Sequence, residues 1–245
     1  MERVDVSIII PTLSEEATLE ACLERLRASG VVEECLVVDG GSGDATVAVA
    51  ARYATQVLVV QGGRPAQCNA GAARAKGRIL CFLHADTTLP ADWRAQVLDV
   101  IDSRGRVAGA FRLGLEGDRR AWRIIEAGAN LRSRWLGLPY GDQAIFVRRD
   151  VFAALGGFRP LPFMEDVDFV LRLRRHGLVG LAPGQVKTSP RRWEREGVFA
   201  TTLRNNLVLL GYLLGVNPTT LYRWYTRSRG DHAPPPPSSP EVTPG

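Results

Sequence analysis

The sequence predicts an α/β fold in which a mostly parallel sheet is sandwiched by helices, in the Rossmann-like manner, within a single compact domain. Four short apolar runs between residues 4 and 86 alternate with stretches of helical periodicity. Continuous apolar runs of this length are typical of strands buried on both faces of a parallel sheet. A chain of 245 residues with 45% hydrophobic and 23% charged residues fits one such domain.

The predicted elements follow one another in order along the first half of the chain. The strands are expected at 4–11, 34–41, 55–62 and 77–86. The first helix begins at Ser14-Glu15-Glu16 and ends at Gly30, because acidic residues favour a first turn and glycine favours a helix end. Further helices are expected to open at Ser42 to Asp44 and to cover 64–75. After about residue 105 the alternation loosens into a β-rich run at 106–115, a helix near 119–135 and short mixed elements.

Composition limits the partners and the compartment. A net charge of +5 is mild for a nucleic-acid binder, and no nucleic-acid partner is expected. It suits an anionic ligand or an anionic membrane surface, with a solvated basic face as the alternative. The four cysteines show no metal-binding spacing, so we expect reduced, structural thiols in a cytoplasmic protein, with a peripheral position at the inner face of a membrane as the alternative.

Two further segments have their own composition. The beginning of the sequence lacks the features of a signal peptide, and no apolar run approaches the ~18 residues that a spanning helix needs. The apolar run at 206–216 is expected to pack on the core or to lie on a bilayer. The tail at 228–245 is rich in proline and serine and is predicted to be disordered.

Polar or glycine-rich residues follow each predicted strand, at Pro11-Thr12, Asp39 to Ser42, Gly62 to Arg64, and His84-Ala85-Asp86. In parallel sheets ligands bind beyond the carboxyl ends of the strands, so these groups are predicted to share one crevice. Asp39 could accept a hydrogen bond from a base or cap the next helix. Asp86 could bind a hard divalent cation completed by diphosphate oxygens, and His84 could bind manganese or brace the loop.

Four segments, in the same order, closely resemble the family-2 glycosyltransferases of the GT-A fold. They are "SIIIPTLSEEATL", "LVVDGGSGDAT", "GGRPAQCNAGAARAKGRILCFLHADT" and "FMEDVDFVLRLRRHG", and the resemblance covers roughly residues 4 to 195. The His-Ala-Asp at 84–86 is similar to a bacterial branch associated with radical-SAM and selenodomain proteins. The resemblance implies a nucleotide-sugar donor, Mn²⁺ or Mg²⁺ as cofactor, and inversion at the anomeric carbon.

The resemblance also assigns residues to the donor. The implied nucleotide-sugar contacts are Pro11, Thr12, Glu15, Asp39, Arg64, Asn69, Ala85 and Asp86. Asp86 would be the metal ligand, with His84 as a second candidate. The sequence departs from the family pattern at Ser14, where asparagine is common, and at His84, which replaces the first aspartate of Asp-x-Asp. The second departure leaves the donor open between a UDP-sugar and, as the alternative, a GDP-sugar.

Glu165 and Asp166 open a predicted helix, where carboxylates are common as caps. The resemblance implies that this pair supplies the catalytic base, for which we favour Asp166, with Glu165 as the alternative or as an acceptor contact. A well-placed base contributes about 10²–10⁴-fold. The acceptor and diphosphate side is expected to comprise Asp142, Gln143, Arg191, Arg192 and Trp193. A basic amphipathic helix start is the alternative for the last three.

The sequence therefore predicts a metal-dependent inverting glycosyltransferase domain over 1–227. Residues up to about 105 would bind the nucleotide-sugar, and 106–227 would bind an acceptor hydroxyl, of a lipid or of a small molecule, and carry a C-terminal helix. A nucleotidyltransferase is one alternative, but no glycine-rich loop with lysine follows the first strand. A catalytically inactive nucleotide-sugar-binding protein is another. The helix at 200–225 could contact a membrane or form a homodimer.

Overall fold

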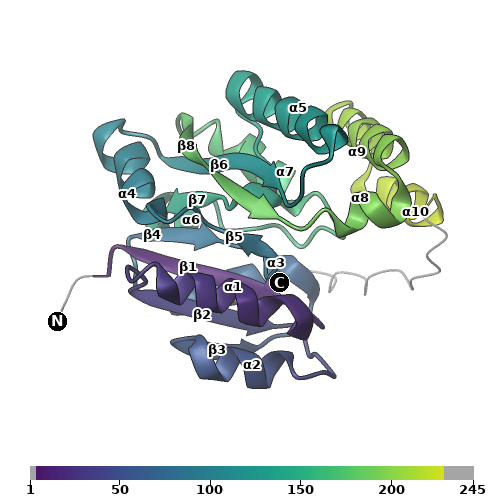
Figure 1. Ribbon diagram of the computed structural model, residues 1–245. Helices are drawn as coiled ribbons and strands as arrows, with labels where there is room; N and C mark the ends of the chain where they lie inside the picture. The colour runs from purple at the N-terminus through teal and green to yellow at the C-terminus, as the bar shows by residue number, and fades with distance from the viewer. Residues whose placement is uncertain (1–3, 229–245) are drawn as a thin grey trace, which may run out of the picture.

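The computed structural model describes residues 4–228 as one curled, mixed eight-stranded sheet with helices on both faces (Figure 1). The strands are β1 (Val6–Thr12), β2 (Glu34–Asp39), β3 (Gln56–Val59), β4 (Ile79–Phe82), β5 (Thr87–Thr88), β6 (Ala108–Leu115), β7 (Phe146–Arg148) and β8 (Val179–Thr188). Their order in the sheet is β3-β2-β1-β4-β7-β6-β8-β5. The predicted α/β architecture and single domain are confirmed.

The helices fill the connections between these strands. They are α1 (Glu16–Ala28), α2 (Thr46–Tyr53), α3 (Gly63–Arg74), α4 (Trp93–Leu98), α5 (Arg120–Leu136), α6 (Arg149–Ala154), α7 (Glu165–Leu173), α8 (Arg191–Glu196), α9 (Val198–Leu213) and α10 (Pro218–Arg227). A π-helical turn, η1 (Asp99–Ser103), follows α4, and a 3-10 turn, η2 (Gly141–Gln143), precedes β7. The predicted strands and helices of the first half are all present.

The parallel half of the sheet comprises β3, β2, β1 and β4. Because successive side chains of a strand point to opposite faces, Ile8 of β1 packs in one apolar core with Leu19 of α1, and Ile9 packs in a second core with Cys68 of α3. A Cβ on Gly71 would lie only 2.6 Å from a methyl carbon of Ile9. Glycine therefore lets α3 approach the sheet closely.

The second half of the sheet is mixed. Strand β7 runs antiparallel to both β4 and β6, while β8 runs parallel to β6 and antiparallel to β5. This mixture explains why the regular alternation of the sequence loosens after residue 105, because antiparallel neighbours need no crossover helix. The predicted run at 106–115 is β6, and the predicted helix near 119–135 is α5.

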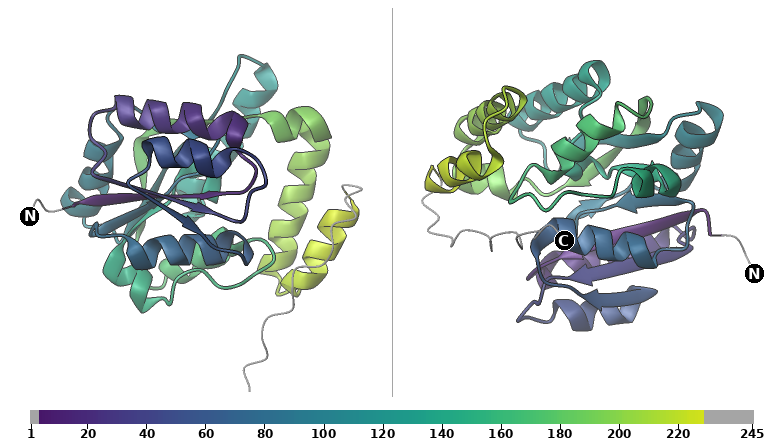
Figure 2. Two further views of the ribbon diagram at one scale, coloured as in Figure 1. Left: turned by 90° about the horizontal axis from the view of Figure 1, so that it is seen from below. Right: turned by 180° about the vertical axis from the view of Figure 1, so that it is seen from behind.

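The last helices, α8 to α10, stand at the edge of the molecule (Figure 2), and Arg191 of α8 contacts Glu15 at the start of α1. Within residues 4–228, no helix has the length and apolar character needed to cross a membrane. The tail predicted to be disordered lies, from residue 229 onward, outside the described residues.

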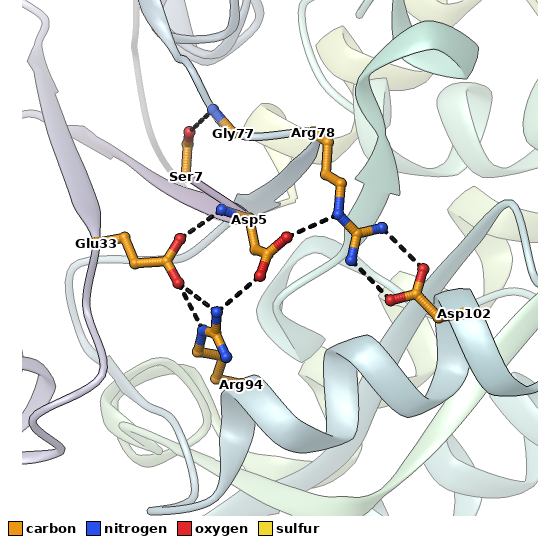
Figure 3. A network of polar contacts seen from close by, with 7 residues as sticks. All are labelled: Asp5, Ser7, Glu33, Gly77, Arg78, Arg94 and Asp102. Carbon is orange, nitrogen blue, oxygen red and sulfur yellow. Dashed lines mark hydrogen bonds and ion pairs between the residues drawn. The ribbon is translucent and has the colours of Figure 1, made fainter. Parts of the chain in front are cut away.

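An ion-pair network closes the amino-terminal edge of the sheet (Figure 3). Arg78, just before β4, contacts Asp5 at 2.8 Å and forms two parallel hydrogen bonds with Asp102 at 2.8 and 2.7 Å. Arg94 of α4 contacts Asp5 at 2.8 Å and also pairs with Glu33. The network ties the starts of β1 and β4 to α4 and η1, and it leaves the opposite, carboxyl-terminal edge free for other groups.

Candidate active site

A pocket lies at the carboxyl-terminal edge of the sheet, where Thr12 and Asp39 end β1 and β2 side by side. Its lining comes from five separate segments of the chain and consists of Pro11, Arg64, Cys68, Phe82, His84, Gly141, Ile145, Phe158, Glu165 and Asp166. The enclosed volume is about 20 Å³, enough for roughly one water molecule. A larger ligand therefore requires side chains at the mouth, such as the half-exposed Arg64, to move.

Backbone strain is concentrated around this pocket. Among the described residues, the only non-glycine residues with positive φ are Ser14 at 54°, Ala144 at 49° and Met164 at 61°. Ser14 precedes Glu15, Ala144 follows η2, and Met164 immediately precedes Glu165. Such conformations cost about 1–3 kcal/mol each and cluster at functional sites. Nothing in the local sequence signalled Ala144 or Met164.

Asp86 faces a cationic group. The Nη2 atom of Arg191 lies 3.2 Å from Asp86 Oδ2 and 3.4 Å from Glu15 Oε2. The other carboxylate oxygen of Asp86 receives only long contacts, 3.4 Å from the hydroxyls of Thr87 and Thr188. The structure thus brings together three predicted site residues that lie up to 176 positions apart in the chain.

In residues 4–228 there is no group of three histidine, cysteine, aspartate or glutamate side chains that could hold a metal ion. A cation at Asp86 would therefore need most of its ligands from a substrate. Burial, reinforced by the nearby Arg64 cation, lowers the pKa of His84 to about 4, although Asp86 and Asp166 oppose the shift. His84 is consequently neutral at pH 7 and keeps a nitrogen lone pair.

Gly141 separates His84 from the start of α7. A Cβ at this position would lie 3.0 Å from His84 Nε2 and 3.3 Å from Asp166 Oδ2, so a side chain here would crowd both groups. The N–H of Gly141 donates a hydrogen bond of 2.7 Å to Asp166 Oδ2, and the N–H of Val167 donates one of 2.8 Å to Oδ1. Backbone donors therefore hold the Asp166 carboxylate in a fixed orientation at the pocket wall.

Glu165, beside Asp166, is buried and pairs with Arg64 across 3.3 Å. Burial raises the pKa of Glu165 above its ordinary value, the Arg64 cation opposes the rise, and the Asp166 carboxylate adds to it. Both carboxylates stand at the amino terminus of α7, where the helix dipole favours negative charge. The Glu165 carboxyl can therefore bind a proton or a cationic group at the pocket wall.

Asp39 is fully buried and is bonded to its own loop. Its Oδ1 accepts from the N–H groups of Gly41 and Ser42, at 2.8 and 2.7 Å, and its Oδ2 accepts from the hydroxyls of Thr12 and Ser42. Burial alone would raise the pKa of Asp39, but these hydrogen bonds outweigh it and lower the pKa. A nucleobase would have to share the carboxylate with these donors.

The side-chain amides of three residues near the site form hydrogen bonds with other parts of the protein. Asn69 binds the backbone of Phe158 through both its amide nitrogen and its oxygen, at 2.8 and 2.9 Å. Gln143 is fully buried, donates to the carbonyl of Phe111 and accepts from Ser133. Sequence reasoning missed Gln67, which donates to the carbonyls of Thr12 and Val38 and joins α3 to two strand ends. As placed, Asn69 and Gln143 fix loops around the pocket.

The remaining acceptor-side residues carry polar atoms that lack partners. Asp142 Oδ1 and the indole N–H of Trp193 are buried without a hydrogen bond among the described residues. Burial raises the pKa of Asp142 to about 6, against the opposing effect of Arg132. Arg192 donates to Asn205 at 3.2 Å, which turns it toward α9. Of the two predicted diphosphate arginines, only Arg191 contacts Asp86.

Comparison with known proteins identifies a family for the chain. The family model described as Glycosyl transferase family 2 matches residues 7–164. A PGL/p-HBAD biosynthesis glycosyltransferase of Mycobacterium bovis is 32% identical over 189 residues, 68% of each chain. Glycosyltransferase AglE of Haloferax volcanii is 31% identical over 110 residues, 41% of this chain and only 36% of that protein.

Solved structures share the fold. The mannosyltransferase PcManGT of Pyrobaculum calidifontis, in complex with GDP-Man and Mn²⁺, has a TM-score of 0.65 at 18% identity over 94% of this chain and 70% of that chain. S. aureus TarS 1–349, in complex with UDP-GlcNAc, has a TM-score of 0.60 at 16% identity over 76% of this chain and 58% of that chain. At these identities the likeness concerns the fold, and it confirms the predicted GT-A architecture.

Proposed function

Because the chain belongs to glycosyl transferase family 2, we propose that it transfers a sugar from a nucleotide-sugar to an acceptor hydroxyl, with inversion at the anomeric carbon. The observation that carries the proposal is one pocket lined by His84, Glu165 and Asp166, with Asp86, which pairs with Arg191, only two residues along the chain from His84. We assign the donor to the half before about residue 105 and the acceptor to the half after it. TarS with UDP-GlcNAc and PcManGT with GDP-Man support a nucleotide-sugar donor, for which we favour a UDP-sugar over a GDP-sugar.

Asp166 is the proposed catalytic base. It takes the proton of the acceptor hydroxyl while that oxygen bonds to the anomeric carbon, and the nucleoside diphosphate leaves with the electrons of the broken bond. The two backbone N–H groups that hold its carboxylate fix the direction from which the proton is taken. Glu165, paired with Arg64, supports the site as an acceptor contact.

Arg64, which lines the pocket, and Arg191, which contacts Asp86, offset the charge of the leaving group. Arg64 is half-exposed at the start of α3, and Arg191 already lies within 3.4 Å of two carboxylates. A guanidinium can bind phosphate oxygens through two parallel hydrogen bonds. Arg64 and Arg191 are therefore the groups we assign to the diphosphate.

A divalent cation, Mn²⁺ or Mg²⁺, fits the residues at Asp86. This carboxylate already accepts one positive group, Arg191, and its second oxygen has only weak contacts. The neutral His84 is compatible with manganese as a second ligand. When bound, the cation would supply positive charge for the diphosphate; PcManGT was solved with Mn²⁺. The His-Ala-Asp sequence is also our reason to propose membership of the branch with this replacement for Asp-x-Asp.

Donor turnover with Mn²⁺ or Mg²⁺ tests the proposal. Asp166→Asn should lower kcat about 10²–10⁴-fold while leaving donor binding unchanged, because the base acts only in the chemical step. Asp86→Ala should instead weaken metal-dependent donor binding. Asp118→Asn, at a fully exposed carboxylate, is the control and should match the wild type.

Two outcomes would contradict the proposal. If the wild type and Asp166→Asn both bind nucleotide-sugars and neither releases nucleoside diphosphate, the chain is a binding protein. Release of pyrophosphate from a nucleoside triphosphate would indicate a nucleotidyltransferase.

A further inference from the structure

Helix α9 presents its apolar side to the outside. Its exposed large side chains include Phe199 at 90%, Leu203 at 62%, Leu210 at 53% and, just after its end, Leu214 at 75%. The positions 199, 203, 207, 210 and 214 follow one face of a helix. No charged residue stands among the exposed positions of α9. We call this surface, with Leu207 and Leu213, the α9 face.

The inward side of the same helix is partly polar. Thr201 is fully buried and Arg204 is 8% exposed. Arg204 pairs with Glu196 of α8 and lies over the ring of Tyr225 of α10, 5.1 Å from its centroid. Losing this buried pair would leave an uncompensated charge, so the polar contacts fix the rotation of α9. The apolar face is therefore held outward by the fold itself.

The surroundings of the α9 face are cationic. Residues 197–228 contain no aspartate or glutamate. Helix α10, which packs against α9, exposes Arg223, Arg227 and Trp224, the last at 43%. Arginine and tryptophan beside an exposed leucine surface are typical of helices that lie in the headgroup region of a membrane. Arginines near such a surface attract anionic lipids.

We propose that the α9 face and α10 dock the protein on an anionic membrane surface, with α9 lying in the plane of the interface. Sixteen residues of α helix span about 24 Å, too short to cross a bilayer but suited to lie along it. A second copy fits less well, because a two-fold contact would bring the same arginines together with no acidic residue from 197–228 to pair with them. Only Gly197 separates α9 from α8, which carries Arg191, so docking would hold Arg191 and the Asp86 that it contacts near the headgroups.

Vesicle co-sedimentation of the full chain tests this proposal. The wild type should bind vesicles of phosphatidylcholine mixed with phosphatidylglycerol, and should bind pure phosphatidylcholine more weakly. Replacing Leu203, Leu207 and Leu210 together by serine should lower the partition at least about tenfold, since three exposed leucines that would be buried in the membrane are lost. The control, Val59→Ser of β3 with Leu178→Ser of the loop before β8, changes two comparably exposed apolar residues away from α9 and should bind like the wild type.

The arginines give an independent measurement. Arg223→Gln with Arg227→Gln should weaken binding to the anionic vesicles, by roughly fivefold for each charge, without affecting pure phosphatidylcholine. Melting temperatures should be unchanged in all variants, because every altered side chain is exposed. If the leucine variant melts early, the arginine pair decides: an undiminished affinity for anionic vesicles overturns the proposal. It is also overturned if the wild type binds no vesicle, or if light scattering finds a dimer that the leucine variant abolishes.

Discussion

Ser14 holds a left-handed backbone conformation, φ 54°, on an exposed loop beside Glu15. Serine pays for this conformation, whereas asparagine tolerates it because its short amide can bond locally. Ser14→Asn should therefore raise the free energy of unfolding by about 0.5–1 kcal/mol, and Ser14→Val should lower it by about 1 kcal/mol or more. Urea denaturation measures both, and shifts of the same sign would show that backbone conformation is not the cause.

Asp142 gives a pH signature. Its pKa is about 6 in the folded protein, against an ordinary value of 3.8. Below pH 3.8 the group is neutral in both states, and above pH 6 the folded protein must hold a buried charge. Stability is thus lost as the pH rises between these values, by about 3 kcal/mol at most, because one pKa unit corresponds to about 1.4 kcal/mol.

Asp142→Asn removes this loss. The melting temperature of the variant should rise relative to the wild type between pH 4 and pH 7, as followed by circular dichroism. The melting temperature of Asp118→Asn, at a fully exposed carboxylate, should change with pH in the same way as that of the wild type. If the difference in melting temperature between Asp142→Asn and the wild type stays constant across this pH range, the Asp142 carboxylate is exposed to water in the folded protein.

At the scale of elements, what the sequence predicts well depends on local pattern. Apolar runs and helix signals predicted the first four strands and the helices between them, because each pattern is complete within a dozen residues. Side-chain roles were harder, since the partners are remote. Asn69 binds Phe158, which lies 89 positions away, and Gln143 binds Phe111 and Ser133. The sequence also could not predict that the apolar side of α9 faces outward, because an apolar stripe has the same spacing whether it faces the core or the solvent.

The network at the amino-terminal edge joins four elements through Arg78 and Arg94 (Figure 3). Arg78→Gln should lower the free energy of unfolding by about 1–2 kcal/mol, because it breaks a pair of parallel hydrogen bonds with Asp102 and the contact with Asp5. The loss should be smaller at high salt. Arg52→Gln breaks a single, more exposed ion pair with Glu20 and should cost less than about 1 kcal/mol. If urea denaturation gives equal losses of unfolding free energy for Arg78→Gln and Arg52→Gln, the network contributes no more stability than a single exposed ion pair.

In the molecule as a whole, the two edges of the sheet have different roles: one stabilises the fold and the other carries the candidate site. The amino-terminal edge is closed by paired charges, whereas the carboxyl-terminal edge carries all three strained non-glycine residues of the described chain and unpartnered atoms at Asp142 and Trp193. Strain and unsatisfied polar groups lower stability unless a ligand relieves them. A ligand that binds this edge should therefore stabilise the entire domain.

Donor binding should accordingly raise the melting temperature. A nucleotide-sugar with Mn²⁺ at about 100 times its Kd would add about 2.7 kcal/mol, which corresponds to a rise of roughly 5–10 °C for a chain of this size. UDP-sugars should give a larger rise than GDP-sugars at equal concentration. Asp86→Ala should lose the part of the rise that depends on Mn²⁺, and Asp166→Asn should keep it, because only Asp86 is assigned to the cation. If no nucleotide-sugar shifts the wild type with either Mn²⁺ or Mg²⁺, the pocket does not bind the proposed donor class.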